Sequence, residues 1–264
     1  MRTFLECVPC FVRQTIDTMR AIGAADATIE EALRRVLRLT AEMDFSMPPA
    51  VMGRDIHRLI RDITKNNDPF TEEKRQQNLL ALELLGDLED LVETAADPFA
   101  AAVRMAIAGN IIDLGAKTHL SENEVRNVIN RALHDPVEGD IDALKEAVLK
   151  AQNILYLADN AGEIVFDRLL VERLPVERVT LAVRGGPAIN DALLDDARAA
   201  GLTNIVRVID NGSDAPGTIL ADCSDEFHRA FENANLIISK GQGNYETLSH
   251  STDKQVFYLL KAKC

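Results

Sequence analysis

The chain has 264 residues, of which 47% are hydrophobic and 27% charged, and its formal net charge is −13. A chain of this length can bury one large core or two smaller ones, and its acidic balance argues against a nucleic-acid binder, because phosphate backbones select positive surfaces. The sequence has no run of about 18 apolar residues that would cross a membrane, and its four cysteines do not form a disulfide scaffold at this length, which favours a cytoplasmic protein.

The first half of the chain, up to about residue 135, has the composition and spacing of helices. Apolar residues recur at helical intervals after Thr28, which is the expected N-cap of its helix. The segment 71–95 is rich in Leu, Glu, Gln and Ala. Ser121 and Glu124 have the spacing of a capping box at the start of a further helix. The sequence predicts an all-helical first domain over residues 1–138.

Strands and helices alternate in the second half, which is predicted to form an α/β domain over residues 139–264. Short apolar strands separated by amphipathic helices indicate a parallel sheet with helices on its faces. The predicted helices are 140–151, 163–174 and 190–200, and the predicted strands are 153–158, 178–183, 204–209, 235–240 and 255–260.

Three of these strands end in polar, glycine-containing loops, at residues 159–163, 184–191 and 240–246. In a parallel sheet the ligand crevice lies beyond the carboxyl ends of the strands, so these loops are expected to meet. Two carboxylates and an amide suit a hard cation such as Mg²⁺ or Mn²⁺, and a nearby lysine suits a phosphate group. The alternative for each loop is a simple helix N-cap.

The motifs LADNAGEIVFDR, VRGGPAINDA and ISKGQGNYETL resemble the family first catalogued as domain of unknown function 89, whose members are described as metal-dependent damage-control phosphatases. The segments CVPCF and AGNIIDLG are similar to the smaller archaeal and bacterial members, so the resemblance runs through nearly the whole chain in order. It implies a helical N-terminal domain packed on a Rossmann-like α/β/α sandwich. Chains of this family usually continue past the segment that ends here at LLKAKC, so either the chain is truncated or its last strands are missing.

The resemblance also implies which residues form the site. Asp159, Asn160 and Asp191 correspond to the metal ligands, for a divalent ion such as Mg, Mn, Co or Ni. Lys240 corresponds to the lysine that contacts phosphate, and Asn244 lies in the same loop near the substrate.

Further residues have two interpretations each. Glu163 is either a catalytic base or a first-turn acid favoured by the helix dipole. The nucleophile is either Asp159 itself or a metal-bound water. Asn110 and Asp113 lie in an apolar helix and form inter-domain hydrogen bonds or line the crevice, the second being favoured by the resemblance. Arg184 contacts a phosphate or faces solvent.

The pair Cys7-x-x-Cys10 is either half of a second metal site or two structural thiols. Cys264 or Cys223 could complete a metal site only if the fold brings them close. The histidines are scattered, and the glycine-containing loops do not match a dinucleotide fingerprint, so NAD binding is not expected.

The sequence therefore predicts a metal-dependent phosphatase that hydrolyses small phosphorylated metabolites, such as damaged or side-product sugar phosphates. Neither nucleic acid nor membrane is expected as a partner, and the pattern gives neither the oligomeric state nor the individual substrate. The first alternative is an S-adenosylmethionine-dependent carboxyl methyltransferase, as proposed for the eukaryotic branch, although the first strand is not followed by an obvious glycine-rich loop. The second alternative is a non-catalytic metal-binding regulatory protein.

Overall fold

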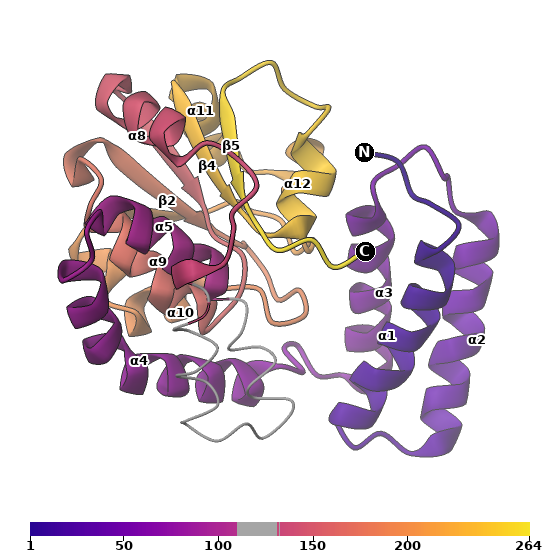
Figure 1. Cartoon of the computed structure of the whole chain (residues 1–264). Coiled ribbons are helices and arrows are strands. Elements are labelled where there is room, and N and C mark those ends of the chain that lie inside the picture. The colour runs from indigo at the N-terminus through magenta and orange to yellow at the C-terminus, as the bar shows by residue number, and fades with distance from the viewer. Residues whose placement is uncertain (110–130, 132) are drawn as a thin grey trace.

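The computed structural model describes residues 1–109, 131 and 133–264, and its centre is a five-stranded parallel sheet between two layers of helices (Figure 1). The strand order is β3-β2-β1-β4-β5 and every neighbouring pair is parallel, which confirms the predicted sheet. The strands are β1 (Ile154–Leu157), β2 (Val179–Val183), β3 (Arg207–Asp210), β4 (Leu236–Lys240) and β5 (Val256–Leu259).

Helices cover both faces of the sheet. One face carries α4 (Thr71–Glu93), α5 (Pro98–Ala108), α8 (Ile141–Lys150), α9 (Glu163–Val171) and α10 (Leu194–Ala199), and the other carries α11 (Asp225–Asn233) and α12 (Gln242–Leu248). Short 3₁₀ helices lie at Val176–Arg178, Leu202–Asn204 and Leu220–Asp222.

The alternation of side chains along β1 explains this three-layer arrangement. Ile154 and Tyr156 pack in one apolar cluster with α9, whereas Leu155 and Leu157 pack in another with α11. All four side chains of β1 are buried, as the central strand of a parallel sheet requires. The α/β/α sandwich is therefore built around β1, at whose carboxyl end Asp159 lies.

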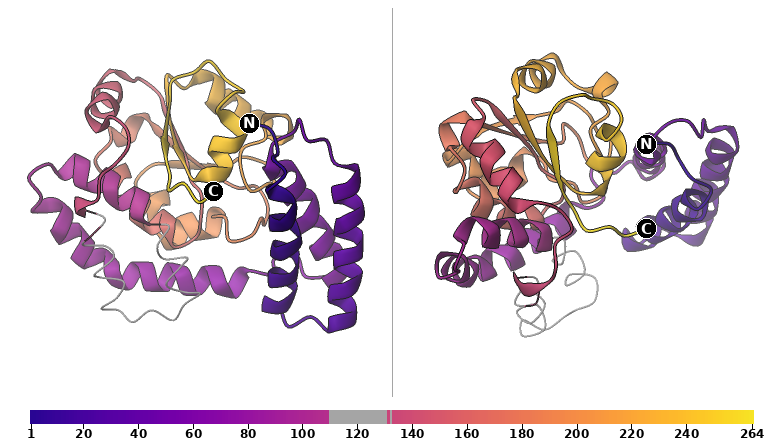
Figure 2. Two further views of the ribbon diagram at one scale, coloured as in Figure 1. Left: turned by 45° about the vertical axis from the view of Figure 1, so that its right-hand side comes forward. Right: turned by 45° about the horizontal axis from the view of Figure 1, so that its top comes forward.

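The first three helices form a separate bundle beside the sheet (Figures 1 and 2). They are α1 (Cys7–Ala21), α2 (Asp26–Glu42) and α3 (Pro49–Thr64), and their own core includes Phe11, Met19, Val36 and Ile56. In contrast, α4 and α5 share the apolar core of the sheet and pack on α9. The hydrophobic cores therefore divide between α3 and α4, and the domain boundary at residue 138 stays a prediction.

Local details differ from the sequence prediction in three places. Helix α2 begins at Asp26 after Ala25, so Thr28 lies inside the helix and is not its N-cap. The helix over 225–233 and the helix over 242–248 were not predicted, because both are short and follow polar segments. The predicted capping box of Ser121 and Glu124 lies outside the described residues.

A row of arginines on α3 attaches the bundle to the α/β part of the molecule. Arg54 forms an ion pair with Asp222, and both Arg58 and Arg61 form ion pairs with Asp214. Arg61 also donates to the carbonyl oxygen of Pro187, 2.5 Å away. Pro187 belongs to the loop after β2, so the bundle directly contacts one of the three predicted site loops.

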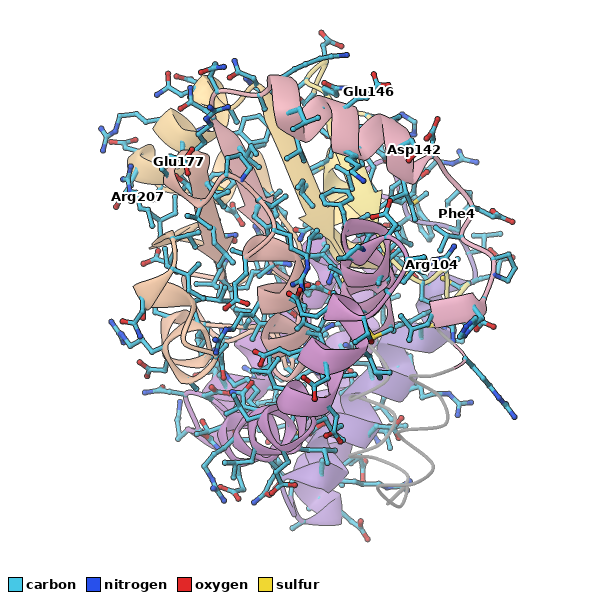
Figure 3. The ribbon with its side chains drawn as sticks, turned by 60° about the vertical axis from the view of Figure 1, so that its left-hand side comes forward. Phe4, Arg104, Asp142, Glu146, Glu177 and Arg207 are labelled. Carbon is cyan, nitrogen blue, oxygen red and sulfur yellow. The ribbon has the colours of Figure 1, made fainter. Side chains whose placement is uncertain are left out.

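The opposite, amino-terminal edge of the sheet has a different character. Figure 3 shows Glu177, which precedes β2, and Arg207, which opens β3, as charged groups at the molecular surface, and Glu146 projecting from α8. These three residues are exposed. Buried polar side chains instead gather at the carboxyl ends of the strands. Among the described residues, no helix is long and apolar enough to cross a membrane.

Candidate functional site

The loops after β1 and β2 are joined by their backbones. Asn160 and Asp191 form an isolated antiparallel bridge. On either side of it, the amide of Ala161 donates to the carbonyl of Asn190 at 2.9 Å, and the amide of Ala192 donates to the carbonyl of Asp159 at 2.8 Å. These bonds bring together the three residues that the sequence predicted as metal ligands.

The side chain of Asn160 is held in one orientation by two carboxylates. Its Nδ2 donates to Asp159 Oδ2 at 2.8 Å and to Glu163 Oε2 at 3.0 Å. Because an amide nitrogen carries two hydrogens, both donors are then engaged, and the amide group is left with its oxygen as the atom that can bind a cation. This orientation is the one that a metal-ligating asparagine needs.

Arg184, at the end of β2, connects the second loop to helix α12. Its Nε donates to Asp191 Oδ2 at 2.6 Å, and its Nη1 donates to Asn244 Oδ1 at 3.1 Å. Its Nη2 lies 3.5 Å from Asp159 Oδ1 and is a buried donor without a hydrogen-bond partner. Arg184 therefore does not face solvent, and one nitrogen of its guanidinium is available to an anionic group beside Asp159.

The carboxylates of Asp159, Glu163 and Asp191 lie close enough to interact electrostatically. Burial, together with the charges of Glu163 and Asp191, raises the pKa of Asp159 well above its usual range. Burial likewise raises the pKa of Asp191, although the guanidinium of Arg184 opposes the rise. In both carboxyls burial disfavours the charged form, and a bound cation would offset that cost.

The donor set of this cluster fits a hard divalent cation. Asp159 and Asp191 offer carboxylate oxygens and Asn160 offers an amide oxygen, which are the ligands that Mg²⁺ and Mn²⁺ prefer. Within residues 1–109, 131 and 133–264, no three His, Cys, Asp or Glu side chains are grouped so that they could hold a metal ion. The set described here combines two carboxylates with an amide.

Lys240, at the end of β4, lies under this cluster and is fully buried. Its Nζ donates to Glu163 Oε1 at 2.6 Å, to the carbonyl of Ala106 at 2.7 Å and to Asp167 Oδ1. Burial lowers the pKa of Lys240, but the two carboxylates outweigh burial and raise it. The ammonium is therefore charged and is held on three sides.

Asp167 is a site residue that the sequence analysis did not identify. It accepts from Lys240 and, at 2.8 Å, from the hydroxyl of Tyr156. Burial raises the pKa of Asp167 to about 6, against the opposing charge of Lys240. Its spacing from Glu163 is i,i+4 on α9, which places two acids on one helix face. Two acids on one face of an apolar helix could have identified Asp167 from the sequence, because two buried carboxylates need a cation between them.

Asn244, in the first turn of α12, is buried and holds the loops together. Its Nδ2 donates to the carbonyl oxygens of Lys240 at 2.8 Å and Ala158 at 3.2 Å, and its Oδ1 accepts from Thr218 at 2.8 Å as well as from Arg184. In this structure its contacts orient Arg184 and fix the end of β4.

Helix α4 supplies three further side chains that the sequence analysis missed. Asn78 Oδ1 accepts from the amide of Gly162 at 2.7 Å, and Gln77 Oε1 accepts from Asn190 Nδ2 at 3.3 Å. Lys74, one turn earlier, is buried and acts electrostatically on Asp191. Lys74, Gln77 and Asn78 have i, i+3, i+4 spacing and so form one polar face of α4. A solvent-exposed helix face has the same pattern, so the sequence alone does not identify these residues as part of a site.

The other predicted residues stay apart from this cluster or outside the description. Asn110 and Asp113 lie outside the described residues. Cys7 and Cys10 are free thiols in the first turn of α1, Cys7 half-buried and Cys10 exposed. Burial raises the pKa of the Cys7 thiol, and Cys264 at the other end of the chain is close enough to act on it electrostatically. Both interpretations of Cys7 and Cys10, as part of a second metal site or as structural thiols, stay predictions.

Gly241 gives the first testable prediction, because a side chain there would collide with Asp159. A Cβ atom on Gly241 would lie 2.0 Å from Asp159 Oδ2, and the residue has a φ of +79°. We expect Gly241→Ala to lower the free energy of unfolding by about 2 kcal/mol or more and to weaken Mn²⁺ binding about tenfold. Urea denaturation and calorimetric titration measure the two effects.

The matched control is Gly86→Ala in α4, where an added Cβ meets no atom within 4 Å. We expect that substitution to raise the free energy of unfolding by about 0.5–1 kcal/mol and to leave Mn²⁺ binding unchanged. Unchanged metal affinity in Gly241→Ala would contradict the assignment of Asp159 as a ligand.

Comparison with known proteins gives a consistent match along the chain. The model of the damage-control phosphatase ARMT1-like domain matches residues 3–264. The damage-control phosphatase of Archaeoglobus fulgidus is 35% identical over 264 residues, covering 98% of this chain and 91% of that protein. The damage-control phosphatase PH1575 of Pyrococcus horikoshii is 35% identical over 274 residues, covering 100% of this chain and 92% of that protein.

The fold agrees with these matches. The crystal structure of PH1575, a DUF89 family protein from Pyrococcus horikoshii, superposes with a TM-score of 0.90 at 34% sequence identity, covering 100% of this chain and 93% of that one. The protein MJ0202 of Methanocaldococcus jannaschii is 36% identical over 272 residues, covering 98% of this chain and 88% of that protein.

Proposed function

Because the chain belongs to the damage-control phosphatase family with the ARMT1-like domain, we propose that it is a metal-dependent phosphatase that hydrolyses small phosphorylated metabolites. One observation carries the proposal beyond family membership. Two carboxylates of raised pKa, an oriented amide and an arginine with an unpartnered nitrogen meet at the carboxyl ends of β1 and β2. We propose that the substrates hydrolysed at this site are sugar phosphates, including damaged ones.

In the proposed mechanism, Asp159, Asn160 and Asp191 hold a divalent cation such as Mg²⁺, Mn²⁺, Co²⁺ or Ni²⁺. When bound, the cation neutralises charge that develops on the phosphoryl group during transfer. Arg184 binds a phosphoryl oxygen through Nη2, the nitrogen that has no hydrogen-bond partner in the structure. Its other two nitrogens keep the guanidinium fixed on Asp191 and Asn244, so this donor is already oriented.

Two nucleophiles are compatible with these residues. The Asp159 carboxylate can attack phosphorus while the ester P–O bond breaks and the alcohol of the metabolite leaves with a proton. Water then hydrolyses the aspartyl phosphate, which releases inorganic phosphate and restores Asp159. Alternatively, a water molecule attacks directly. Glu163 is the candidate base for that water, but its two oxygens already accept from Lys240 and Asn160. This geometry favours Glu163 as the residue that orients the Asn160 amide.

The proposal is tested by phosphate release from p-nitrophenyl phosphate and a panel of sugar phosphates. The protein is stripped with a chelator and then supplied with Mg²⁺, Mn²⁺, Co²⁺ or Ni²⁺ one at a time. We expect no turnover in stripped protein and restoration by at least one cation. Tight cation binding without turnover on any ester would overturn the proposal in favour of a non-catalytic metal-binding protein, and methyl transfer from S-adenosylmethionine would then be assayed.

A further inference from the structure

Resting on the proposed function, we infer that Lys74 of α4 is the lysine that contacts the phosphate group of the substrate, and that Lys240 is a positioning residue. The sequence motif favours the opposite assignment, because Lys240 follows β4 within a glycine-containing loop. The contacts of the two ammonium groups distinguish them.

The ammonium of Lys240 has no donor left for a substrate. A lysine carries three N–H groups, and those of Lys240 face the carbonyl of Ala106 and the carboxylates of Glu163 and Asp167. Its side chain is 0% exposed. Contact with a phosphate would require one of these bonds to break and would leave a buried carboxylate without its cation, which is costly.

The first two turns of α4 face the site directly. Gln77 and Asn78 bond to Asn190 and to the amide of Gly162, which lie in the loops that follow β2 and β1. Asn78 also donates to Asp196 of α10 at 2.7 Å, so α4 is held against that helix as well. Lys74 lies on the same helix face, four residues before Asn78, and its side chain is buried there.

The ion pair of Lys74 has the character of an exchangeable contact. Among the described residues its Nζ has one ionic partner, Asp68 Oδ2 at 2.6 Å, while Asp68 Oδ1 accepts from the amide of Phe70. The Asp68 side chain is 17% exposed, so water can solvate its carboxylate when Lys74 turns away, whereas Glu163 and Asp167 around Lys240 are 3% and 0% exposed. A phosphate dianion offers a lysine stronger acceptors than a single carboxylate does.

The two cations that this assignment gives to the substrate come from different layers of the molecule. Arg184 extends from the end of β2 and donates to Asp191. Lys74 extends from α4, four residues before Asn78, which accepts from the amide of Gly162 in the loop after β1. A phosphate group bound beside Asp191 would therefore be contacted from the sheet and from the helical side. Asp68 would lose its partner as the phosphate enters, so Asp68 is a competitor for Lys74.

The test measures binding of inorganic phosphate to the full chain in the presence of Mg²⁺ by calorimetry. We expect Lys74→Met to weaken phosphate binding about tenfold or more and to raise KM for sugar phosphates by a similar factor. Mg²⁺ binding should not weaken, because the substitution removes a positive charge from the neighbourhood of Asp191. We expect Asp68→Asn to strengthen phosphate binding about threefold, because the competitor is removed while an Asn oxygen still accepts from Phe70. Lys150→Met, in an exposed i,i+4 pair with Glu146, is the matched control and should match wild type.

Two results would overturn the assignment. One is wild-type phosphate affinity and KM in Lys74→Met, which would leave the proposed phosphatase activity standing. The other is weaker phosphate binding in both Lys74→Met and Asp68→Asn, which would mean that the ion pair only holds the start of α4. Phosphate binding that depends on Lys74, in a protein that hydrolyses no ester, would support the assignment and refute the phosphatase proposal.

Discussion

Replacing Lys240 by methionine is expected to lower the free energy of unfolding by about 3–5 kcal/mol, because the substitution leaves two buried carboxylates without their cation. Glu163 and Asp167 are 3% and 0% exposed, and each accepts a hydrogen bond from Lys240. Urea denaturation at pH 8 measures the loss. Tyr156→Phe is the graded control, since it removes one hydrogen bond to Asp167 and is expected to cost about 1 kcal/mol.

The pH dependence of this loss is a second readout of the same variant. The pKa of Asp167 is already raised to about 6 with Lys240 present, and loss of the ammonium raises it further. A carboxyl whose pKa is higher in the folded state than in the unfolded state stabilises the fold at low pH and loses that contribution as the pH rises through the folded pKa. The deficit of Lys240→Met should therefore be smaller at pH 5.5 than at pH 8, and an equal deficit at both would contradict the pairing.

Asp159→Asn is expected to lower phosphatase turnover by about 1,000-fold or more while raising the free energy of unfolding. The carboxylate is needed for cation binding or for nucleophilic attack. In the metal-free protein, however, burial first and then the charges of Glu163 and Asp191 disfavour its charged form and raise its pKa. Removing its charge relieves both effects.

Asp191→Asn separates the two effects. It should lose turnover to a similar extent but should also lose stability, because Arg184 is 2% exposed and Asp191 accepts its shortest hydrogen bond. Turnover assays in excess Mn²⁺ and urea denaturation after chelation measure both variants. Equal loss of stability in the two variants, or turnover in Asp159→Asn within tenfold of wild type, would be incompatible with the roles assigned to them.

The sequence allowed the sheet, and the proximity of Asp159, Asn160 and Asp191, to be predicted for a physical reason. The strands are apolar runs bounded by polar loops, and the carboxyl ends of parallel strands lie at one edge of the sheet. Placing Asp159 and Asn160 after one strand and Asp191 after the next therefore placed them close together. The family resemblance is confirmed by the match over residues 3–264, and the α/β fold by the similarity to the solved structure of PH1575.

The remainder of the site depends on contacts that no local pattern encodes. Lys240 was predicted to contact phosphate because of its motif, and its burial between Glu163 and Asp167 follows only from how α9 packs on β4. Polar residues at helical spacing, such as Lys74 and Asn78, have the same pattern whether they face solvent or a sheet edge. The assignment of α4 to the core of the sheet likewise depends on tertiary packing.

The contacts that fasten the site loops join residues far apart along the chain. The hydrogen bond between Gly162 and Asn78 joins residues that are 84 positions apart in the sequence. The bond between Asn190 and Gln77 spans 113 positions, and the bond between Pro187 and Arg61 spans 126. Such long-range contacts form late in folding, because the intervening chain must be ordered first. They also lie where the bundle and α4 meet the sheet, so partial loosening of the helices releases the loops while the strands stay paired. Enzymatic competence is therefore a more fragile property of this protein than its secondary structure, and on heating or in mild denaturant it should be the first to disappear.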